Sequence, residues 1–306
     1  MGNGPVEARW QSGGLPLRIR VAQCGTTLRV VVSTRSVEPH YGKPAARRSE
    51  DKSFMSCCRL GLGLLCVLGL LADALAQDAV KPVVLYAVPP AIVRGEKTKL
   101  ALRGLQLDQA AKLKLVGVEP EIVLTPKPGK VAVPNGLEAA KVGDAQVETE
   151  FTLPEASTGE SVEFVVETAT GEKTSIKIPV IEKAAFVAEK EPNQGFVQAQ
   201  PLAVGQVVRG MIQEARDVDV FRIEVKAGQK LLIELWGERL GTPLDGAMAI
   251  YDDRGRRVAA NDDRHGRDPQ LEPTASRDGV WFLSVTDAND SGSGLHGYVL
   301  KLKSGG

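Results

Sequence analysis

Residues 279–287, GVWFLSVTD, and residues 217–225, DVDVFRIEV, decide the fold class of this 306-residue chain. In both stretches apolar side chains alternate with polar ones or come in short runs, and valine, isoleucine and aromatic residues dominate. A period of two is typical of a β-strand with one face in a core. Few parts of the chain hold a helical spacing over a useful length. The pattern therefore predicts an all-β protein.

From Gln77 onward the chain divides into two modules of such strands. In the first module, residues 77–183, the predicted strands are 83–88, 97–103, 112–116, 146–152, 162–168 and 174–180. Turn signals such as Pro89-Pro90 and Pro134-Asn135-Gly136 separate them. Residues 118–141, rich in proline and glycine, are predicted to form an insertion or an irregular edge. Six short strands at this spacing favour an immunoglobulin-like β-sandwich.

The second module covers residues 184–306 and follows a linker at residues 182–185. Its predicted strands are 206–211, 218–225, 230–236, 247–251, 258–260, 279–287 and 297–302. It offers no segment long enough for a framework helix. The fold class expected for the whole chain is thus all-β, with two β-sandwich modules in series.

The N-terminal quarter has a different character. Residues 55–76 carry one arginine, an apolar run over 60–71 and a closing Ala74-Leu75-Ala76, the pattern of a secretory signal peptide. Residues 1–54 are interpreted as an upstream start-site extension or a disordered segment. All four cysteines precede residue 77, so an exported chain that begins there has no cysteine nucleophile, Cys-ligated metal or disulfide.

Charge argues against nucleic acid as a partner. The formal net charge is zero, but residues 1–76 hold 10 Lys and Arg against 5 Asp and Glu, of 38 and 38 in the chain. Subtraction leaves 28 against 33 for the remainder, which is mildly acidic. No basic field of the kind that attracts nucleic acid is present there. The export segment predicts a secreted, periplasmic or cell-surface location with no membrane span after cleavage.

The second module carries a series of short motifs in a fixed order. They are Glu191-Pro192-Asn193, Gly205 to Gly210, Asp217-Val218-Asp219-Val220-Phe221, Ala227-Gly228-Gln229, Pro243-Leu244-Asp245, Tyr251 to Gly255, Asn261-Asp262-Asp263, Gly279 to Val285 and Tyr298-Val299-Leu300. This series, over about residues 186–304, resembles the bacterial pre-peptidase C-terminal (PPC) family. More loosely, residues 86–96 resemble the first hairpin of immunoglobulin-like modules in bacterial exported proteins. The PPC resemblance implies a jelly-roll-like sandwich that serves secreted proteases and other exported proteins as a non-catalytic accessory.

The same resemblance implies a calcium site at five positions, all with side-chain oxygen donors: Glu189, Glu191, Asn193, Asp217 and Asp219. Calcium takes six to eight oxygen ligands from flexible loops, which carboxylates and amide carbonyls supply. Two departures from the family pattern oppose this assignment, since Gln194 stands where an Asp is common and Val220 replaces an aromatic residue. Two interpretations stay open, a calcium site or turn-forming and solvated residues.

Further chemistry-bearing patterns have weaker support. Residues 261–272 match parts of an EF-hand loop, but strands flank them and the first and fifth positions are wrong, so a turn is predicted. His265 and His296 are the histidines after residue 76, and no motif pairs them with a nucleophile. Ser291 and Ser293 near His296 are interpreted as a surface loop, and Asp252-Asp253 as a turn rather than a glycosidase pair.

The resulting prediction is an exported, non-enzymatic binding or structural protein with a PPC-type module and calcium as its candidate cofactor. An extracellular protein or polysaccharide is the candidate partner. A matrix- or polysaccharide-binding module is a second hypothesis, for which exposed aromatic residues would be the evidence. Trp236 and Trp281 lie in strand patterns that predict burial, so no stacking platform is expected from them. An accessory chain of a secreted peptidase and a hydrolase with an unrecognised site are also compatible with the sequence.

Overall fold

The computed structural model describes residues 18–24, 27–33, 81–119 and 121–306. The chain forms two compact units, Met1–Ala74 and Leu75–Gly306. The first unit holds an antiparallel pair, β1 (Arg18–Cys24) and β2 (Thr27–Ser33), inside the segment that was expected to be a start-site extension or disordered. The predicted signal peptide over 55–76 lies outside the described residues.

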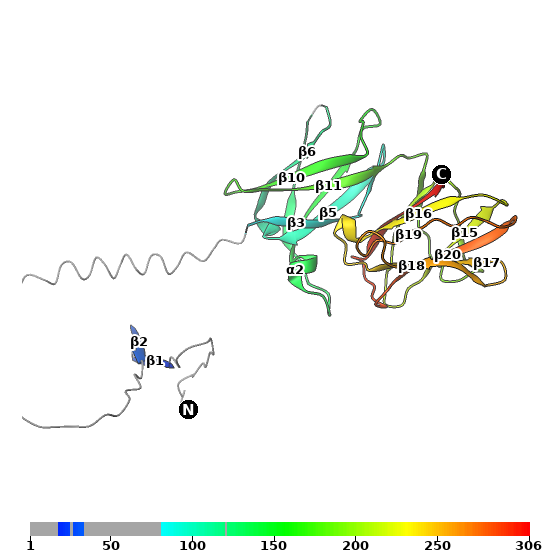
Figure 1. The fold of residues 1–306 in the computed structure, drawn as a ribbon. Helices are drawn as coiled ribbons and strands as arrows, with labels where there is room; N and C mark the ends of the chain where they lie inside the picture. The colour runs from blue at the N-terminus through cyan, green and yellow to red at the C-terminus, as the bar shows by residue number, and fades with distance from the viewer. Residues whose placement is uncertain (1–17, 25–26, 34–80, 120) are drawn as a thin grey trace, which may run out of the picture. The chain divides into compact units, whose positions relative to one another are not determined.

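The second unit opens with a β-sandwich of two sheets (Figure 1). One sheet has the strand order β3 (Val83–Val88), β5 (Lys97–Leu105), β9 (Ala145–Thr152) and β8 (Lys127–Lys130). The other has the order β4 (Ile92–Val93), β11 (Lys173–Ile181), β10 (Ser161–Thr168), β6 (Ala110–Val116) and β7 (Ile122–Leu124). Short helical turns are η1 (Leu107–Gln109) and α2 (Ala139–Val142). As predicted, residues 118–141 supply edges, because β7 and β8 each end a sheet.

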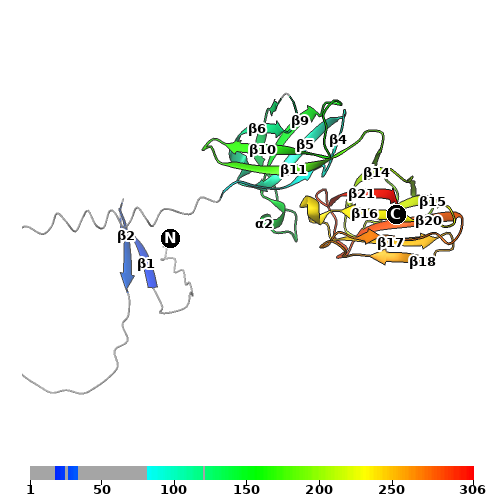
Figure 2. The ribbon, with the colours of Figure 1, turned by 45° about the horizontal axis from the view of Figure 1, so that its top comes forward.

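The second sandwich has two five-stranded sheets. The first contains β12 (Phe186–Ala188), β14 (Val207–Met211), β21 (Gly297–Ser304), β16 (Leu231–Trp236) and β19 (Gln270–Leu271) in that order. The second contains β13 (Gln200–Pro201), β15 (Asp219–Val225), β20 (Gly279–Asp287), β17 (Gly246–Asp252) and β18 (Arg257–Asn261); of these, β15, β20, β17 and β18 lie side by side in Figure 2. A 3-10 turn, η2 (Glu238–Leu240), follows β16.

Strict alternation along the strands builds each core. In β20, Trp281, Leu283 and Val285 are buried, while the residues between them face outward. Their partners on β15 and β17 are buried likewise, so one face of this sheet closes the core of the second sandwich. The first sandwich has a separate core in which Phe151 meets Phe164 edge to face, with ring centroids 5.4 Å apart.

Every strand predicted from the sequence has a counterpart in the structure, and the two-sandwich, all-β prediction is confirmed. Between residues 81 and 306 the strands that were not predicted are short ones, such as β4, β12, β13 and β19, whereas β1 and β2, also not predicted, have seven residues each. Among the described residues, the structure contains no helix with the length and apolarity that a membrane crossing would need.

Candidate metal centre

The acidic residues singled out from the sequence converge at one end of the second sandwich. Glu189 directly follows β12, and Asp219 is the first residue of β15. One carboxylate oxygen from each of Glu189, Glu191 and Asp219 lies within 4.8 Å of the others. Residues distant in the sequence are thus brought together by the packing of two strand ends. We call residues 189–193 the acidic segment.

Hydrogen bonds fix the acidic segment against the neighbouring strands. The backbone N–H of Met211, the last residue of β14, donates to Glu189 Oε2 at 3.1 Å. Asn193 Nδ2 donates to Glu189 Oε1 at 3.2 Å, and the Asn193 backbone N–H donates to Glu191 Oε2 at 3.0 Å. Because its Nδ2 is engaged in this way, the amide of Asn193 keeps its Oδ1 free to face a cation.

Three buried oxygens of this region have no hydrogen-bond donor in the structure. They are Asn193 Oδ1, Asp217 Oδ1 and Asp219 Oδ1, and among the described residues the one other buried side-chain atom without a hydrogen-bond partner is the donor Trp236 Nε1. Asn193 and Asp219 are fully buried and Asp217 is 5% exposed. Leaving a buried polar atom unpaired is costly, so native proteins nearly always satisfy such atoms. The Asp219 carboxylate belongs to the 4.8 Å group with Glu189 and Glu191, so this arrangement fits a cation with several oxygen ligands; Asp217 lies outside that group.

Electrostatics of the metal-free cluster point the same way. Burial, opposed by the N–H of Met211 and reinforced by the charge of Glu191, raises the pKa of Glu189 to about 7. Burial, reinforced by the charge of Glu189, raises the pKa of Asp219 to about 8. Without a cation the cluster holds protons that isolated carboxylates would have lost. A bound divalent ion would replace those protons.

Two residues outside the five predicted ligands, Tyr298 and Gln194, donate hydrogen bonds to carboxylates of the cluster. Tyr298 on β21 donates its hydroxyl to Asp219 Oδ2 at 2.5 Å, and burial raises the pKa of this tyrosine well above its usual range. Tyr298 pairs with Gly210 on β14, where an added Cβ would collide with the tyrosine ring. Gly210, already noted as a motif position, therefore makes room for the donor. Gln194, the expected departure, donates its Nε2 to Glu191 Oε2 at 3.1 Å.

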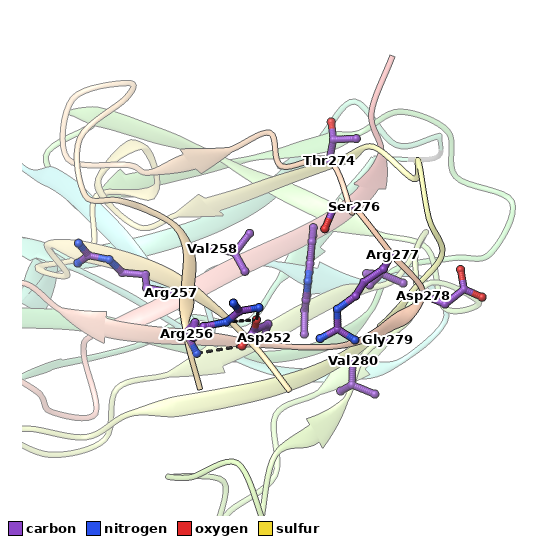
Figure 3. A pocket seen from close by; sticks show the side chains of 12 residues that line it. Asp252, Arg256, Arg257, Val258, Thr274, Ser276, Arg277, Asp278, Gly279 and Val280 are labelled. Atoms are coloured by element: carbon purple, nitrogen blue, oxygen red, sulfur yellow. Dashed lines mark hydrogen bonds and ion pairs between the residues drawn. The ribbon is translucent and has the colours of Figure 1, made fainter. Parts of the chain in front are cut away.

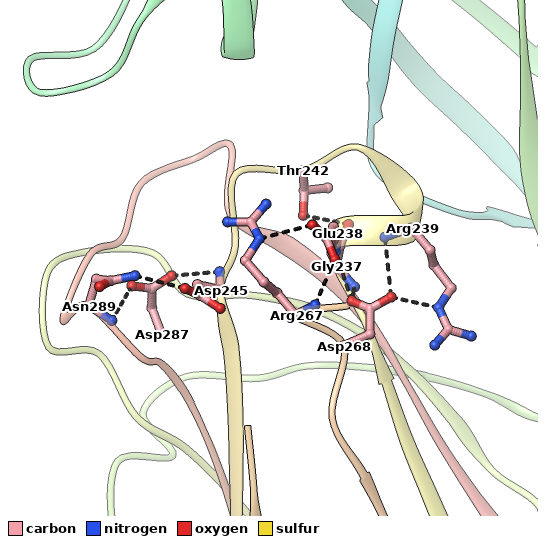
Figure 4. Close-up of polar contacts among 9 residues, drawn as sticks. All are labelled: Gly237, Glu238, Arg239, Thr242, Asp245, Arg267, Asp268, Asp287 and Asn289. Atoms are coloured by element: carbon pink, nitrogen blue, oxygen red, sulfur yellow. Dashed lines mark hydrogen bonds and ion pairs between the residues drawn. The ribbon is translucent and has the colours of Figure 1, made fainter. Parts of the chain in front are cut away.

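Two more buried carboxylates of the same sandwich provide an internal comparison. Asp268, 1% exposed, accepts from the backbone N–H groups of Gly237 at 2.7 Å, Glu238 at 2.8 Å and Arg239 at 3.2 Å (Figure 4). It also accepts from Arg239 Nε at 2.6 Å. Asp287 likewise accepts three backbone N–H groups, at 2.9–3.0 Å. These carboxylates are satisfied by the protein itself and need no ion.

The remaining chemistry-bearing patterns form turns. Asn261 Oδ1 accepts from the backbone of Gln270, and the His265 side chain meets the Gln270 side chain at 3.2 Å. Ser293 Oγ lies 2.8 Å from His296 Nδ1, but the two residues share one tight turn in which the N–H of His296 donates to the Ser293 carbonyl. His296 is 2% exposed, and burial lowers its pKa. This contact is typical of a local turn, not of an open catalytic pair.

A cavity of about 300 Å³ opens at one end of the second sandwich (Figure 3). Asp252 lies on its wall and accepts both guanidinium bonds from Arg256, at 2.7 and 2.9 Å, together with two backbone N–H groups of its own turn. These hydrogen bonds, with the Arg256 side chain as the first cause, hold the pKa of Asp252 down to about 2. Asp253 is paired with Arg277. Both carboxylates are therefore already paired with arginines in and beside the turn.

The match to a known protein family falls on this sandwich. The family model of the bacterial pre-peptidase C-terminal domain matches residues 217–287. A Deinococcus radiodurans protein named "Probable subtilase-type serine protease" is 28% identical over an alignment of 130 residues that covers 37% of this chain and 18% of that relative. The chain thus corresponds to less than a fifth of the relative's length.

Two solved structures are also similar. The pre-peptidase C-terminal domain of a Bacillus anthracis collagenase matches with 16% identity and a TM-score of 0.30, over 37% of this chain and 99% of that one. A Bacteroides ovatus glucan-utilisation protein, SGBP-B in complex with a mixed-linkage heptasaccharide, matches with 9% identity and a TM-score of 0.26, over 68% of this chain and 74% of that one. On the family match and the motif order, this chain contains a bacterial pre-peptidase C-terminal domain.

Proposed function

We propose that this chain is an exported, non-catalytic binding or structural protein whose second sandwich is stabilised by one calcium ion. The observation that carries the proposal is the set of three buried oxygens without a hydrogen-bond partner, on Asn193, Asp217 and Asp219, of which the Asp219 carboxylate lies in one 4.8 Å group with Glu189 and Glu191. The five candidate ligand residues all offer a side-chain oxygen atom, and none offers a sulfur or an imidazole nitrogen. Such a ligand set suits a hard cation. Calcium tolerates irregular geometry better than magnesium, which demands a near-octahedral shell.

The non-catalytic part of the proposal is supported by the state of the candidate catalytic groups. Asp252 and Asp253 are each bound to an arginine, and Ser293 and His296 contact each other within one turn. The matched domain is an accessory type, and the subtilase-type relative carries its similarity in a stretch that covers 18% of its length. An accessory role beside a secreted peptidase is compatible with the same features.

Calcium titration by isothermal calorimetry tests the proposal directly. We expect one calcium ion per chain to bind to the chelator-treated protein. Asp219→Asn should weaken binding at least about tenfold, because it removes a charged ligand from the shell. Asp262→Asn is the matched control, since Asp262 belongs to the other acidic stretch, and it should titrate like the wild type. Absence of a calcium heat, or loss of binding in the control alone, contradicts the proposal.

The raised pKa values predict how stability depends on pH. Without metal, folded Glu189 and Asp219 have pKa values of about 7 and about 8, above their ordinary 4.5 and 3.8. The folded state therefore binds more protons than the unfolded state between about pH 4 and pH 8, so the free energy of unfolding falls as pH rises through this window. Calcium replaces these protons, and its stabilising effect should grow over the same window.

Melting temperatures at about pH 5 and about pH 8, in buffers with and without calcium, check this dependence. The calcium-free protein should melt lower at the higher pH, and the shift caused by calcium should be larger there. The Glu189→Gln, Asp219→Asn double variant cannot titrate at these positions and should lose this fall. A wild-type profile that matches the double variant would show that the two carboxylates are not the titrating groups.

A further inference from the structure

The outer face of the sheet β13–β15–β20–β17–β18 lacks charge at its centre. The outward positions of its two central strands are uncharged in every case: Ala247, Ala249, Tyr251, Val280, Phe282, Ser284 and Thr286. Solvent-facing positions of an antiparallel sheet are ordinarily polar, while buried positions are apolar. This face therefore has a composition that packing of the core does not require.

An aromatic side chain from outside the sheet lies on this face. Phe196 follows the acidic segment and stacks on Phe282, with ring centroids 4.5 Å apart and planes inclined by 13°. Tyr251 lies beside it, with centroids 5.6 Å apart at 48°. Phe196 nevertheless remains 41% exposed and its neighbour Val197 is 100% exposed. One face of the Phe196 ring is covered by Phe282, and much of the rest is open to solvent.

Arginines flank the rings on both sides. The strand register pairs Arg222 with Phe282, Phe282 with Tyr251, and Tyr251 with Arg257, so the four residues form one row across β15, β20, β17 and β18. Strands are about 4.8 Å apart, which separates the two arginine backbones by about 14 Å. Arg222 meets Glu224 at 3.1 Å on the surface, whereas Arg257 forms no ion pair with a carboxylate of residues 81–119 or 121–306.

We propose that this row binds an acidic polysaccharide. A pyranose ring presents a flat face of C–H groups that packs on an exposed ring such as Phe196. A guanidinium binds a carboxylate through paired N–H bonds, so Arg222 and Arg257 are placed to hold uronate groups on either side of the stacked sugar. The inference rests on the proposed binding role, but it does not depend on the calcium ion.

Charge favours a glycan over a nucleic acid, although bases also stack on aromatic residues. Nucleic acid carries a phosphate on every nucleotide, and its binding surfaces present many cations along the strand. Here two arginines flank the rings, and the chain after residue 76 is mildly acidic, with 28 Lys and Arg against 33 Asp and Glu. A polymer with spaced carboxylates matches this distribution better.

Native affinity electrophoresis tests the proposal, with hyaluronan as the uronate-bearing polymer and hydroxyethylcellulose as the neutral one. We expect hyaluronan to retard the protein and hydroxyethylcellulose to leave its mobility unchanged. Phe196→Leu, which keeps an apolar side chain over Phe282, should weaken binding about tenfold. Arg257→Gln should weaken it about threefold, in line with an exposed ion pair. Arg264→Gln, at an exposed arginine outside the row, should bind like the wild type.

Each gel is run with calcium and with chelator, and the melting temperature of every variant is measured alongside. Absence of retardation by hyaluronan, equal retardation by the neutral polymer, or wild-type binding by Phe196→Leu would overturn the proposal. Stronger retention by oligo(dT) than by hyaluronan would overturn it in favour of single-stranded nucleic acid. Failure of calcium binding appears in the calorimetric titration, so the two proposals fail independently.

Discussion

Asp219→Asn is expected to lower the stability of the protein relative to the wild type only when calcium is present. In the calcium-free protein the neutral amide removes the cost of burying a carboxylate, which the charge of Glu189 increases, so the melting temperature should stay level or rise. With calcium the variant loses a charged ligand. At free calcium of about 100 times the dissociation constant, the wild type should gain about 2.7 kcal/mol, or about 5–10 °C, that the variant lacks.

Differential scanning fluorimetry with calcium and with chelator measures both halves of this prediction. Glu191→Gln should behave in the same way, because the Glu191 carboxylate belongs to the same 4.8 Å group. Asp262→Asn should keep the full calcium shift. A calcium-free Asp219→Asn protein that melts far below the wild type would mean that this carboxylate stabilises the fold through protein contacts alone, which contradicts a role as a metal ligand.

Asp268→Ala should destabilise the second sandwich by about 3 kcal/mol, whether or not calcium is present. The buried carboxylate accepts three backbone N–H groups around η2 and the Arg239 side chain, and alanine would leave these donors without an acceptor. Chemical denaturation gives the free energy of unfolding. Asp253→Ala is the control, because its ion pair with Arg277 is exposed and its loss should cost less than about 1 kcal/mol.

Equal destabilisation by Asp253→Ala and Asp268→Ala would show that burial does not separate the two classes of carboxylate. A calcium-dependent effect of Asp268→Ala would place this residue in the metal region, where the structure does not put it. The pair of variants thus tests the distinction between satisfied and unsatisfied carboxylates on which the metal assignment depends.

Alternation of side chains made much of the fold predictable. The strands predicted over 83–88 and 279–287 coincide with β3 and β20, in which buried side chains recur at every second position along most of the strand. The strands β12, of three residues, and β13, of two, were not predicted. Each pairs in parallel with a strand further along the chain, and so short a segment has no period to detect.

The site was predictable in part. Its five oxygen-bearing residues came from the family resemblance and from the ligand preference of calcium, and the structure brings Glu189, Glu191 and Asp219 together. Tyr298 was not predicted as a partner of Asp219, because the contact spans 79 residues and depends on tertiary packing. The sequence feature linked to the Tyr298 contact is Gly210, because a side chain at this position would collide with the tyrosine ring.

The aromatic surface was missed for a different reason. The strand positions of the tryptophans predicted burial and no stacking platform; Trp281 is 7% exposed, as predicted, whereas Trp236 is only partly buried. The rings that form the surface are instead Phe196, in a connecting segment, and Phe282 and Tyr251, at outward strand positions. The alternation of β20 already assigned Phe282 to the solvent side, so a large aromatic residue there was the available signal.

A crystal structure of the protein grown with calcium, with the anomalous signal recorded, tests the central claim most directly. The account predicts one ion between the acidic segment and the start of β15. Its oxygen ligands should include Asn193 Oδ1 and Asp219 Oδ1 at about 2.3–2.6 Å. A calcium peak at residues 261–272, or water alone hydrogen-bonded to Asn193, Asp217 and Asp219, would contradict it.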